Sequence, residues 1–355
     1  MSTEGNTSNV DIIKCETCGA DLVFDPGKGV LACPYCSNAV KIAVEASQER
    51  DYFAYENFGG TESFGINFKC PNCNADVVFE KETAGQCPFC GATCVLEKSA
   101  MPGIKPDSVL PFSVDKGGAS ESGKKWIKKR WFAPSAAKKA FSIDNMNGVY
   151  APCFSFTADT FSDYQGRLGE HYTVMVGSGK NRHPETRTRW FTVSGVYSML
   201  LRDIVIESSS HLDQKQMDKI GPFDIPNSVG FKKDFLAGFS AERHNETIKQ
   251  CFGIAKQKMT SQIRAGILSK YRYDVVDYLN INTTYNTVRF RHILLPLWVC
   301  AFRFKQKVFN FFVNGRTGKA AGKYPISPVR VAFAVIGGLA VVAGAVFLIL
   351  KMMAS

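Results

Sequence analysis

Two stretches near the N-terminus, CETCGADLVFD at residues 15–25 and CPNCNADVVFE at residues 70–80, match each other closely. Each is followed by a second Cys-x-x-Cys pair, after 14 residues in the first unit and 13 in the second. Paired cysteines at this spacing are typical of a ribbon that holds zinc in four thiolates. The duplication therefore predicts two zinc ions, one in each ribbon. The predicted ligands are Cys15, Cys18, Cys33 and Cys36 in the first ribbon, and Cys70, Cys73, Cys87 and Cys90 in the second.

Two other interpretations of the cysteines are weaker. A disulfide framework needs an oxidising compartment, and the N-terminus MSTEGNTSNVD lacks the basic start and apolar stretch of an export signal. A redox role explains four pairs at ribbon spacing poorly. Cys94 follows Cys90 closely and is an alternative ligand. Cys153, Cys251 and Cys300 lie in apolar or helical patterns, so we expect them to be buried thiols.

The C-terminal segment VAFAVIGGLAVVAGAVFLIL, residues 331–350, contains no charged residue. Twenty helical residues span about 30 Å, the thickness of a bilayer core. A buried core helix is the alternative, but only five residues follow the segment. We therefore predict a transmembrane helix at residues 329–351 that anchors the chain by its tail. Small residues four positions apart, such as Ala334 and Gly338, would allow such helices to self-associate.

Basic residues indicate the orientation of this anchor. Four of them, Arg316, Lys319, Lys323 and Arg330, precede the segment, whereas Lys351 alone follows it. The positive-inside rule then places the bulk of the chain in the cytoplasm, at the inner membrane. Reduced zinc thiolates require the same compartment.

The chain between the ribbons and the anchor alternates strand-like and helical patterns. Strands are expected at residues 108–114, 148–159, 171–176, 187–201, 234–243 and 292–304, and helices at residues 121–140 and 246–268. Two strand–helix–strand modules would make one α+β domain with a mixed or antiparallel sheet. The expected organisation is ribbon 1 at residues 1–45, a linker at 46–62, ribbon 2 at 63–98, the α+β domain at 101–325 and the transmembrane helix.

No local motif indicates catalysis. GRTGK at residues 315–319 lacks the four-residue gap of a phosphate-binding loop, so Asn314-Gly315 predicts a hairpin turn. The five histidines are scattered, and no Gly-x-Ser-x-Gly or His-Glu-x-x-His motif occurs. We expect a protein that is not an enzyme. An enzyme with a site in the α+β domain remains an alternative, because catalytic groups need not be close in sequence.

The charge is divided along the chain. The 355 residues carry a net charge of +11, with 45% hydrophobic and 21% charged residues, which excludes wholesale disorder. Residues 1–100 hold 14 acidic and 7 basic residues, and two zinc–thiolate sites would make this part more acidic. Residues 101–355 hold 36 basic and 18 acidic residues. An acid-free basic segment before an anchor is attracted to anionic lipid headgroups, whereas acidic ribbons would repel nucleic acid.

The segment KKWIKKRWFAPSAAKK at residues 124–139 is the second basic feature. It is interpreted as an amphipathic helix that packs Ile127 and Trp131 on the sheet, as a membrane-surface helix, or as a binder of single-stranded nucleic acid. The residues predicted to contact a membrane surface or another polyanion are Lys124, Lys125, Lys128, Lys129, Arg130, Arg303, Lys305, Lys307, Arg316, Lys319, Lys323 and Arg330.

Several stretches resemble a bacterial family of tail-anchored proteins with zinc ribbons of the transcription-factor-IIB type. They are CPNCNADVVFE, CPFCGATCVLEKSAMPGIKPDSVLPFSVDK, KKRWFAPS, GVYAPCFSFTAD, GRLGEHYTV and FFVNGRTGKAAGKYPIS. Some relatives are labelled replication-restart helicases, but this chain lacks the Walker A motif of a helicase. The resemblance implies a membrane platform associated with phage-shock-protein-A-like systems.

The sequence therefore favours a non-enzymatic adaptor at the cytoplasmic membrane. Its acidic zinc ribbons would recruit a protein partner, and its basic body would contact anionic lipid. The alternative is a membrane-tethered protein that binds nucleic acid through the basic helix at residues 124–139.

Overall fold

The computed structural model describes most of the chain. The described residues are 13–58, 66–70, 72–73, 75–79, 84–90, 92–95, 104–139, 146–209, 212–305 and 307–354. Residues 59–62 of the expected linker and residues 63–65 and 96–98 of the expected second ribbon lie outside these ranges.

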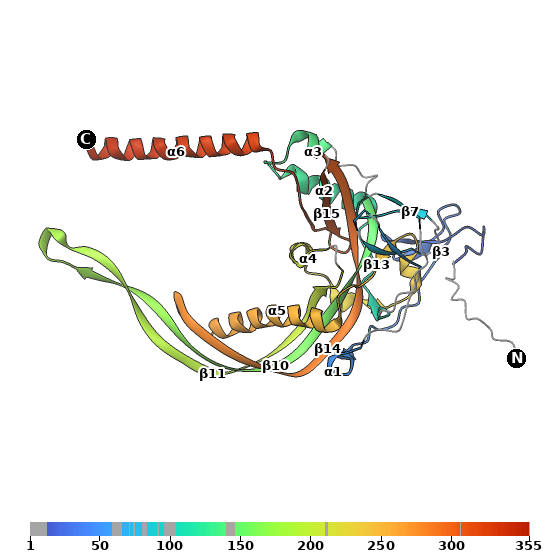
Figure 1. The fold of residues 1–355 in the computed structure, drawn as a ribbon, viewed down its shortest axis with the longest axis horizontal. Helices are drawn as coiled ribbons and strands as arrows, with labels where there is room; N and C mark the ends of the chain where they lie inside the picture. Colours follow the sequence, from blue (N-terminus) through green and yellow to red (C-terminus); the bar gives the residue numbers. More distant parts are fainter. Residues whose placement is uncertain are drawn as a thin grey trace.

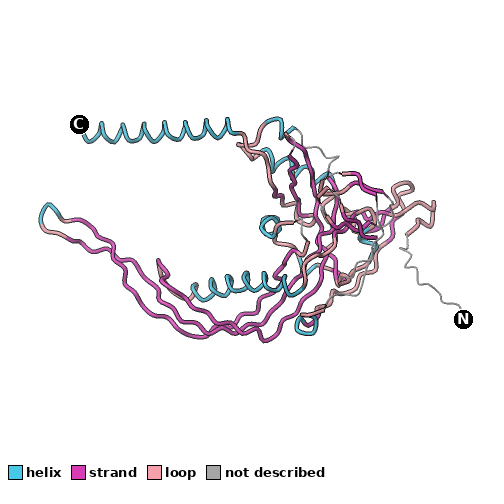
Figure 2. The backbone as a smooth tube through the Cα atoms, viewed as in Figure 1, coloured by secondary structure: helices cyan, strands magenta, loops and turns pink. Residues whose placement is uncertain are grey.

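Three long antiparallel strands form the centre of the fold. β10 (Met146–Val176) lies between β11 (His183–Glu207) and β14 (Val275–Phe304). Side chains of β10 alternate between buried and exposed from Ala158 to Leu168, as expected for a sheet with one covered face. The three strands form a curved ribbon that extends from the rest of the molecule (Figures 1 and 2). We call this extension, residues 158–201 and 275–288, the arm.

Shorter strands widen the sheet near the body of the molecule. The hydrogen-bonded order is β12-β9-β14-β10-β13-β6-β5, with β4 and β15 also on β14, β11 on β10 and β16 on β15. β9 and β13 pair in parallel with β14 and β10, so the sheet is mixed. The bounds are β4 (Arg50–Asp51), β5 (Ile66–Lys69), β6 (Asp76–Phe79), β9 (Ser108–Val109), β12 (Val229–Gly230), β13 (Ser240–Glu242), β15 (Lys307–Asn314) and β16 (Ala320–Gly322).

The helix α5 (Ile248–Leu268) covers the inner face of the arm (Figure 1). Thr247 and Gln250 form a capping box at its start, which satisfies backbone N–H groups of the first turn. Buried residues recur every three or four positions along α5, as an amphipathic helix requires. They pack with Tyr164, Leu168 and other inner-face residues of the arm in one buried cluster.

The remaining helices are short, except for the C-terminal one. α2 rests on β15, with the ring of Trp126 stacked 5.8 Å from that of Phe311. The bounds are α1 (Tyr52–Tyr55), α2 (Lys116–Lys128), α3 (Ser135–Lys139), α4 (Gln214–Ile220) and α6 (Pro328–Ala354), with 3₁₀ helices at Gly179–Asn181, Ile225–Asn227 and Lys233–Leu236.

Both cysteine ribbons are packed on this body. In the first, β1 (Val23–Asp25), β2 (Val30–Ala32) and β3 (Ala39–Val40) form a separate sheet, and Phe24 contacts Phe235 and Phe239 edge-on. In the second, β7 (Ala84–Gln86) pairs with β8 (Thr93–Val95), while β6 pairs with β13. The second ribbon thus shares backbone hydrogen bonding with the central sheet.

The mixed α+β class is confirmed, but several element predictions need correction. The helix expected at residues 121–140 is divided into α2 and α3, because Pro134 lies between them and cannot continue a helix. The strand expected at 234–243 begins as a 3₁₀ helix and keeps only three strand residues. The strands expected at 171–176 and 187–201 are continuous parts of β10 and β11.

Candidate metal centres and basic surface

The four cysteines of the first ribbon converge. The sulfur atoms of Cys15 and Cys36 are 3.4 Å apart, as are those of Cys18 and Cys33, and all four lie within 4.8 Å of one another. Sulfurs at 2.3 Å from a tetrahedral ion are about 3.8 Å apart. The separations exceed the roughly 2.05 Å of a disulfide, and all four cysteines are free. The group is therefore shaped for a metal ion.

The local backbone explains this convergence. The N–H of Cys15 donates to the carbonyl of Ala20, and the N–H of Cys33 donates to that of Asn38, so both pairs adopt the same tight turn. The turns place Gly19 and Ser37 in the left-handed region, at φ values of 70° and 61°. Hydrogen bonds from the backbone N–H groups of Cys18 and Thr17 lower the pKa of Cys15, which favours its thiolate, whereas the pKa of its hydrogen-bonded neighbour Cys36 is raised.

The second group repeats this geometry in a more buried setting. The sulfurs of Cys70 and Cys90 are 3.5 Å apart, those of Cys73 and Cys87 are 3.6 Å apart, and the group again fits within 4.8 Å. Cys70 and Cys87 are almost completely buried. The N–H groups of these two cysteines donate five residues ahead, to the carbonyls of Ala75 and Ala92.

The two tetra-cysteine groups confirm the predicted grouping of the eight cysteines. Each could hold one metal ion, and four thiolates in a tetrahedral arrangement favour zinc among the common metals. Of the remaining cysteines, Cys153, Cys251 and Cys300 are buried, as expected. Burial raises the pKa of Cys251 and of Cys300 to about 12, so both remain protonated thiols. The side chain of Cys94 lies outside the described residues.

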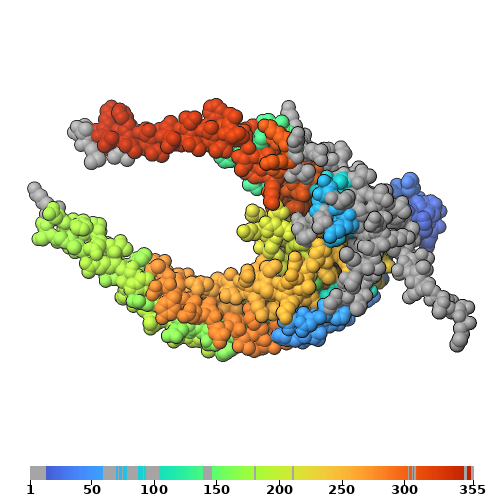
Figure 3. Space-filling model, in the orientation of Figure 1, coloured from blue at the N-terminus to red at the C-terminus, as the bar shows by residue number. Residues whose placement is uncertain are grey.

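The helix α6 extends away from the body (Figure 3), and its apolar side chains are exposed. Among the described residues, it is the one helix that is long and apolar enough to cross a bilayer, and its apolar stretch is not buried. At its base, Arg330 donates to the carbonyls of Trp131 and Ala133, both at 2.7 Å. Arg330 also donates to the hydroxyl of Ser135, so the start of α6 is tied to the segment between α2 and α3.

The basic helix packs on the body, as the first of its three interpretations predicted. Its buried side chains are not the ones that were expected. Trp126 and Ile127 are buried against the body, whereas Trp131 is 61% exposed. α2 ends at Lys128, so Trp131 lies beyond it and does not share a helical face with Ile127. The predicted pairing of Ile127 with Trp131 is therefore wrong. The lysines Lys124, Lys125, Lys128 and Lys129 are exposed.

Among the described side chains, some of the other predicted polyanion residues are engaged within the molecule and some are exposed. Arg130 stacks on Trp126, with its guanidinium 4.7 Å from the ring centre. Arg316 pairs with Asp224 at 3.3 Å, and Lys319 donates to the carbonyl of Gly221. Lys305, Lys307 and Lys323 are exposed, whereas the side chain of Arg303 lies outside the described residues.

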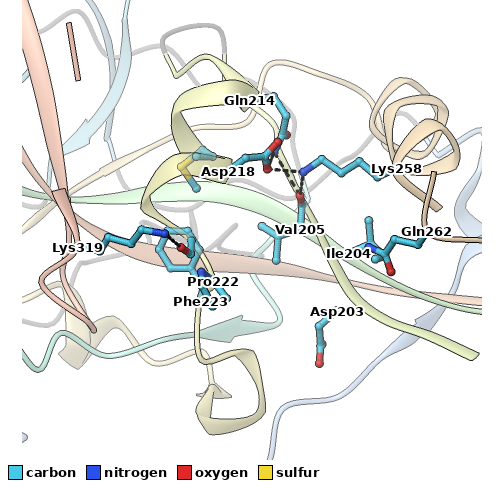
Figure 4. A pocket seen from close by; sticks show the side chains of 12 residues that line it. Asp203, Ile204, Val205, Gln214, Asp218, Pro222, Phe223, Lys258, Gln262 and Lys319 are labelled. Carbon is cyan, nitrogen blue, oxygen red and sulfur yellow. Dashed lines mark hydrogen bonds and ion pairs between the residues drawn. The ribbon is translucent and has the colours of Figure 1, made fainter. Parts of the chain in front are cut away.

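A cavity of about 460 Å³ lies between α4, α5 and the end of β11 (Figure 4). The charged groups that line it have partners within the molecule. Lys258 contacts Asp218 at 2.5 Å and the carbonyl of Val205 at 3.1 Å, and Asp203 pairs with Arg291 at 2.9 Å. The described lining contains neither histidine nor cysteine. The charged groups of the described lining, Asp203, Asp218, Lys258 and Lys319, are each engaged in an ion pair or a hydrogen bond.

A buried polar cluster near the sheet was missed by sequence reasoning. Ile104 donates its N–H to Nε2 of His244 and accepts from Nδ1 of His292, which fixes both histidines in place. Desolvation lowers the pKa of His244 to about 4 and that of His292 well below its usual value. Ile104, His244 and His292 lie far apart in the sequence, and no local spacing signals their convergence. Separately, burial raises the pKa of Glu207, the last residue of β11, to about 9.

The fold and its sites define a class of protein with two tetra-cysteine metal-binding ribbons on a mixed α+β sheet and a long apolar C-terminal helix. The chain is 30% identical over 340 residues to YdjG of Bacillus subtilis strain 168, a protein described as uncharacterized. The alignment covers 96% of each chain. The chain therefore belongs to the YdjG family. No protein-family profile matches it, and no solved structure matches it significantly.

Proposed function

We propose that this protein is a non-enzymatic, membrane-anchored adaptor whose zinc ribbons recruit a protein partner to the cytoplasmic face of the membrane. The observation that carries the proposal is the pairing, in one chain, of two tetra-cysteine groups with an exposed apolar helix at the other terminus. The ribbons lie at the end of the molecule opposite to the tip of α6 (Figure 1). A membrane that holds α6 would leave the ribbons accessible from the cytoplasm.

The first ribbon has side chains suited to a protein contact. Tyr35 lies between two predicted ligands, Cys33 and Cys36, and is 82% exposed. Val44 is 58% exposed, near β3 at the edge of the ribbon's sheet. Tyrosine is enriched among the residues that contribute most to protein interfaces. The resemblance to membrane-stress proteins makes a phage-shock-protein-A-like coat protein the first partner to examine.

Partner capture from native membranes tests the ribbon role. The full-length chain with Tyr35→Ala and Val44→Ser should lose the partner, while its metal content stays at two ions. A matched control is Tyr172→Ala, which removes an exposed tyrosine from the arm. An unchanged partner set in the ribbon variant would contradict the proposal.

Removal of α6 tests the anchor separately. A chain that ends at residue 326 should leave the membrane fraction and remain in solution. We further propose that the exposed lysines of α2 contact anionic headgroups, each worth about 1 kcal/mol near the surface. The shortened chain should then sediment with anionic vesicles more than with neutral ones, and Lys→Gln changes at residues 124, 125, 128 and 129 should reduce this binding.

The alternative is a membrane-tethered nucleic-acid binder that uses the same helix. The observation in its favour is the exposed Trp131, which follows four exposed lysines and could stack on a base. Binding of single-stranded oligonucleotide should then fall steeply with salt and with Trp131→Ala. No binding at low salt would exclude it.

A further inference from the structure

Both outer strands of the arm have one side without a neighbouring strand. Among the described residues, β11 pairs with β10 alone, and β14 pairs with β10 alone between Val275 and Val288. Such edges present rows of backbone N–H and C=O groups that can pair with another chain. Natural proteins usually guard long edges with charges, prolines or cover.

These two edges carry little protection of that kind. Residues 192–201, TVSGVYSMLL, and residues 279–288, LNINTTYNTV, contain no charge and no proline. Both runs flank the same part of β10, since Ala158 faces Leu201 on one side and Val288 on the other. Arg264 of α5 donates to the carbonyl of Leu279, so the run available to a partner begins at Asn280.

The outer face of the arm adds an uncovered apolar surface. Phe161, Val196 and Leu200 are 42%, 60% and 49% exposed. They lie on the face opposite α5, because the alternate residues of β10 are buried beneath that helix. An apolar stripe beside two unguarded edges is typical of a surface that is covered in an assembly.

We propose that the arm is a self-assembly surface, in which β14 of one copy pairs with β11 of the next copy. β11 and β14 are both antiparallel to β10, so they run in the same direction. Two copies in the same orientation can therefore join through a parallel strand pair without either copy being inverted. Copies held in one membrane by the anchor proposed above would share such an orientation, and this part of the inference rests on that proposal; it favours a second copy over an unrelated chain as the occupant.

This pairing is head-to-tail. Each copy retains one unpaired edge after the first contact, so the same contact can repeat into a row or close into a ring. Pairing of β14 with β14 of a second copy would instead be antiparallel and would stop at a dimer. The two arrangements make opposite predictions for cross-linking.

Engineered cysteines distinguish them. Ser194 and Asn280 are exposed and face Gln165 from opposite sides of β10, so they lie at the same level of the arm. Full-length chains with Ser194→Cys and with Asn280→Cys, reconstituted together in vesicles, should form disulfide-linked dimers under mild oxidation. Either variant alone should give no more dimer than the parent chain. The absence of mixed dimers, or equal dimer formation by Asn280→Cys alone, would overturn the proposal.

A second measurement does not depend on disulfide geometry. Asn280→Lys with Thr284→Lys places two charges on the β14 edge and should reduce the mass of the full-length protein in detergent to that of one copy. Gln165→Lys adds a charge to the same face on the central strand, where no edge is altered, and should preserve the larger mass. An unchanged mass in the edge variant, or equal loss in the control, would contradict edge pairing.

Discussion

The structure predicts that the second metal site stabilises the central sheet as well as its own ribbon. Cys87→Ser removes one of the four sulfurs and should release the ion, and with it the order of the ribbon. β6 pairs with β13 of the sheet, and Val77 and Phe89 are almost fully buried in the same cluster as β10 residues. Loss of the ribbon would expose both side chains.

The size of the effect follows from that burial. Full exposure of a buried valine or phenylalanine costs about 1.5–3 kcal/mol, so the two together cost about 3–6 kcal/mol. For a domain of this size, that corresponds to a fall in Tm of roughly 6 °C or more. Thermal unfolding followed by near-UV circular dichroism, with metal content measured by mass spectrometry, should show one ion and the lower Tm.

A matched control is Cys300→Ser, because it makes the same chemical change at a buried cysteine that belongs to neither group. This variant should keep two ions and report only the cost of a buried hydroxyl. If Cys87→Ser loses one ion while its Tm falls no further than that of the control, the ribbon is independent of the sheet and the reasoning fails.

Three further predictions concern packing, charge and the anchor. Trp126→Ala should cost about 3–5 kcal/mol in chemical denaturation, whereas Trp131→Ala should change stability by less than about 0.5 kcal/mol. Folding raises the pKa of Glu207 from 4.5 to about 9, so its contribution to stability is complete below about pH 4.5 and is lost as the pH rises toward 9. The Tm of Glu207→Gln should therefore rise relative to that of the parent between pH 5 and pH 9. A difference in Tm that stays constant over this range would mean that the carboxyl of Glu207 is exposed to water, and would contradict the prediction. Arg330→Ala should accelerate amide exchange at Ser327, whose N–H donates to the carbonyl of Phe132, and leave exchange in α5 unchanged.

The sequence predicted the two metal groups because their ligands obey local rules. Two cysteines separated by two residues form a tight turn by themselves, and the duplicated spacing needs no knowledge of distant contacts. The C-terminal helix was predictable for the same reason, because its apolar residues follow one another in the sequence. A turn was also predicted at Asn314-Gly315, and a turn does join β15 to β16 there, but it is longer than a two-residue hairpin loop and its left-handed residue is Gly318 rather than Gly315.

The arm was not predictable in the same way. Residues 171–176 and 187–201 have strand patterns, but the three-stranded arm also depends on β14, which pairs with β10 from Met146 to Gly169 across more than 100 residues of sequence. The polar cluster at Ile104 has the same origin, because His244 and His292 meet it from different elements. The buried face of α2 was not predictable from the sequence either. Trp126 is buried because its ring stacks on Phe311 of β15, which lies far away in the sequence.

The directions of α6 and the arm have a consequence for membrane insertion. Both leave the body toward the same side of the molecule (Figure 1), so a flat bilayer crossed by α6 in this arrangement would also enclose the arm. The arm exposes Asp163 and Arg167, and each charge costs about 2.5–3.5 kcal/mol at the centre of a bilayer. Insertion in that way would therefore require a change in the direction of α6 relative to the body. The contacts of Arg330 at the start of α6 would open in that change, so they would hold the helix in its present direction until it enters lipid.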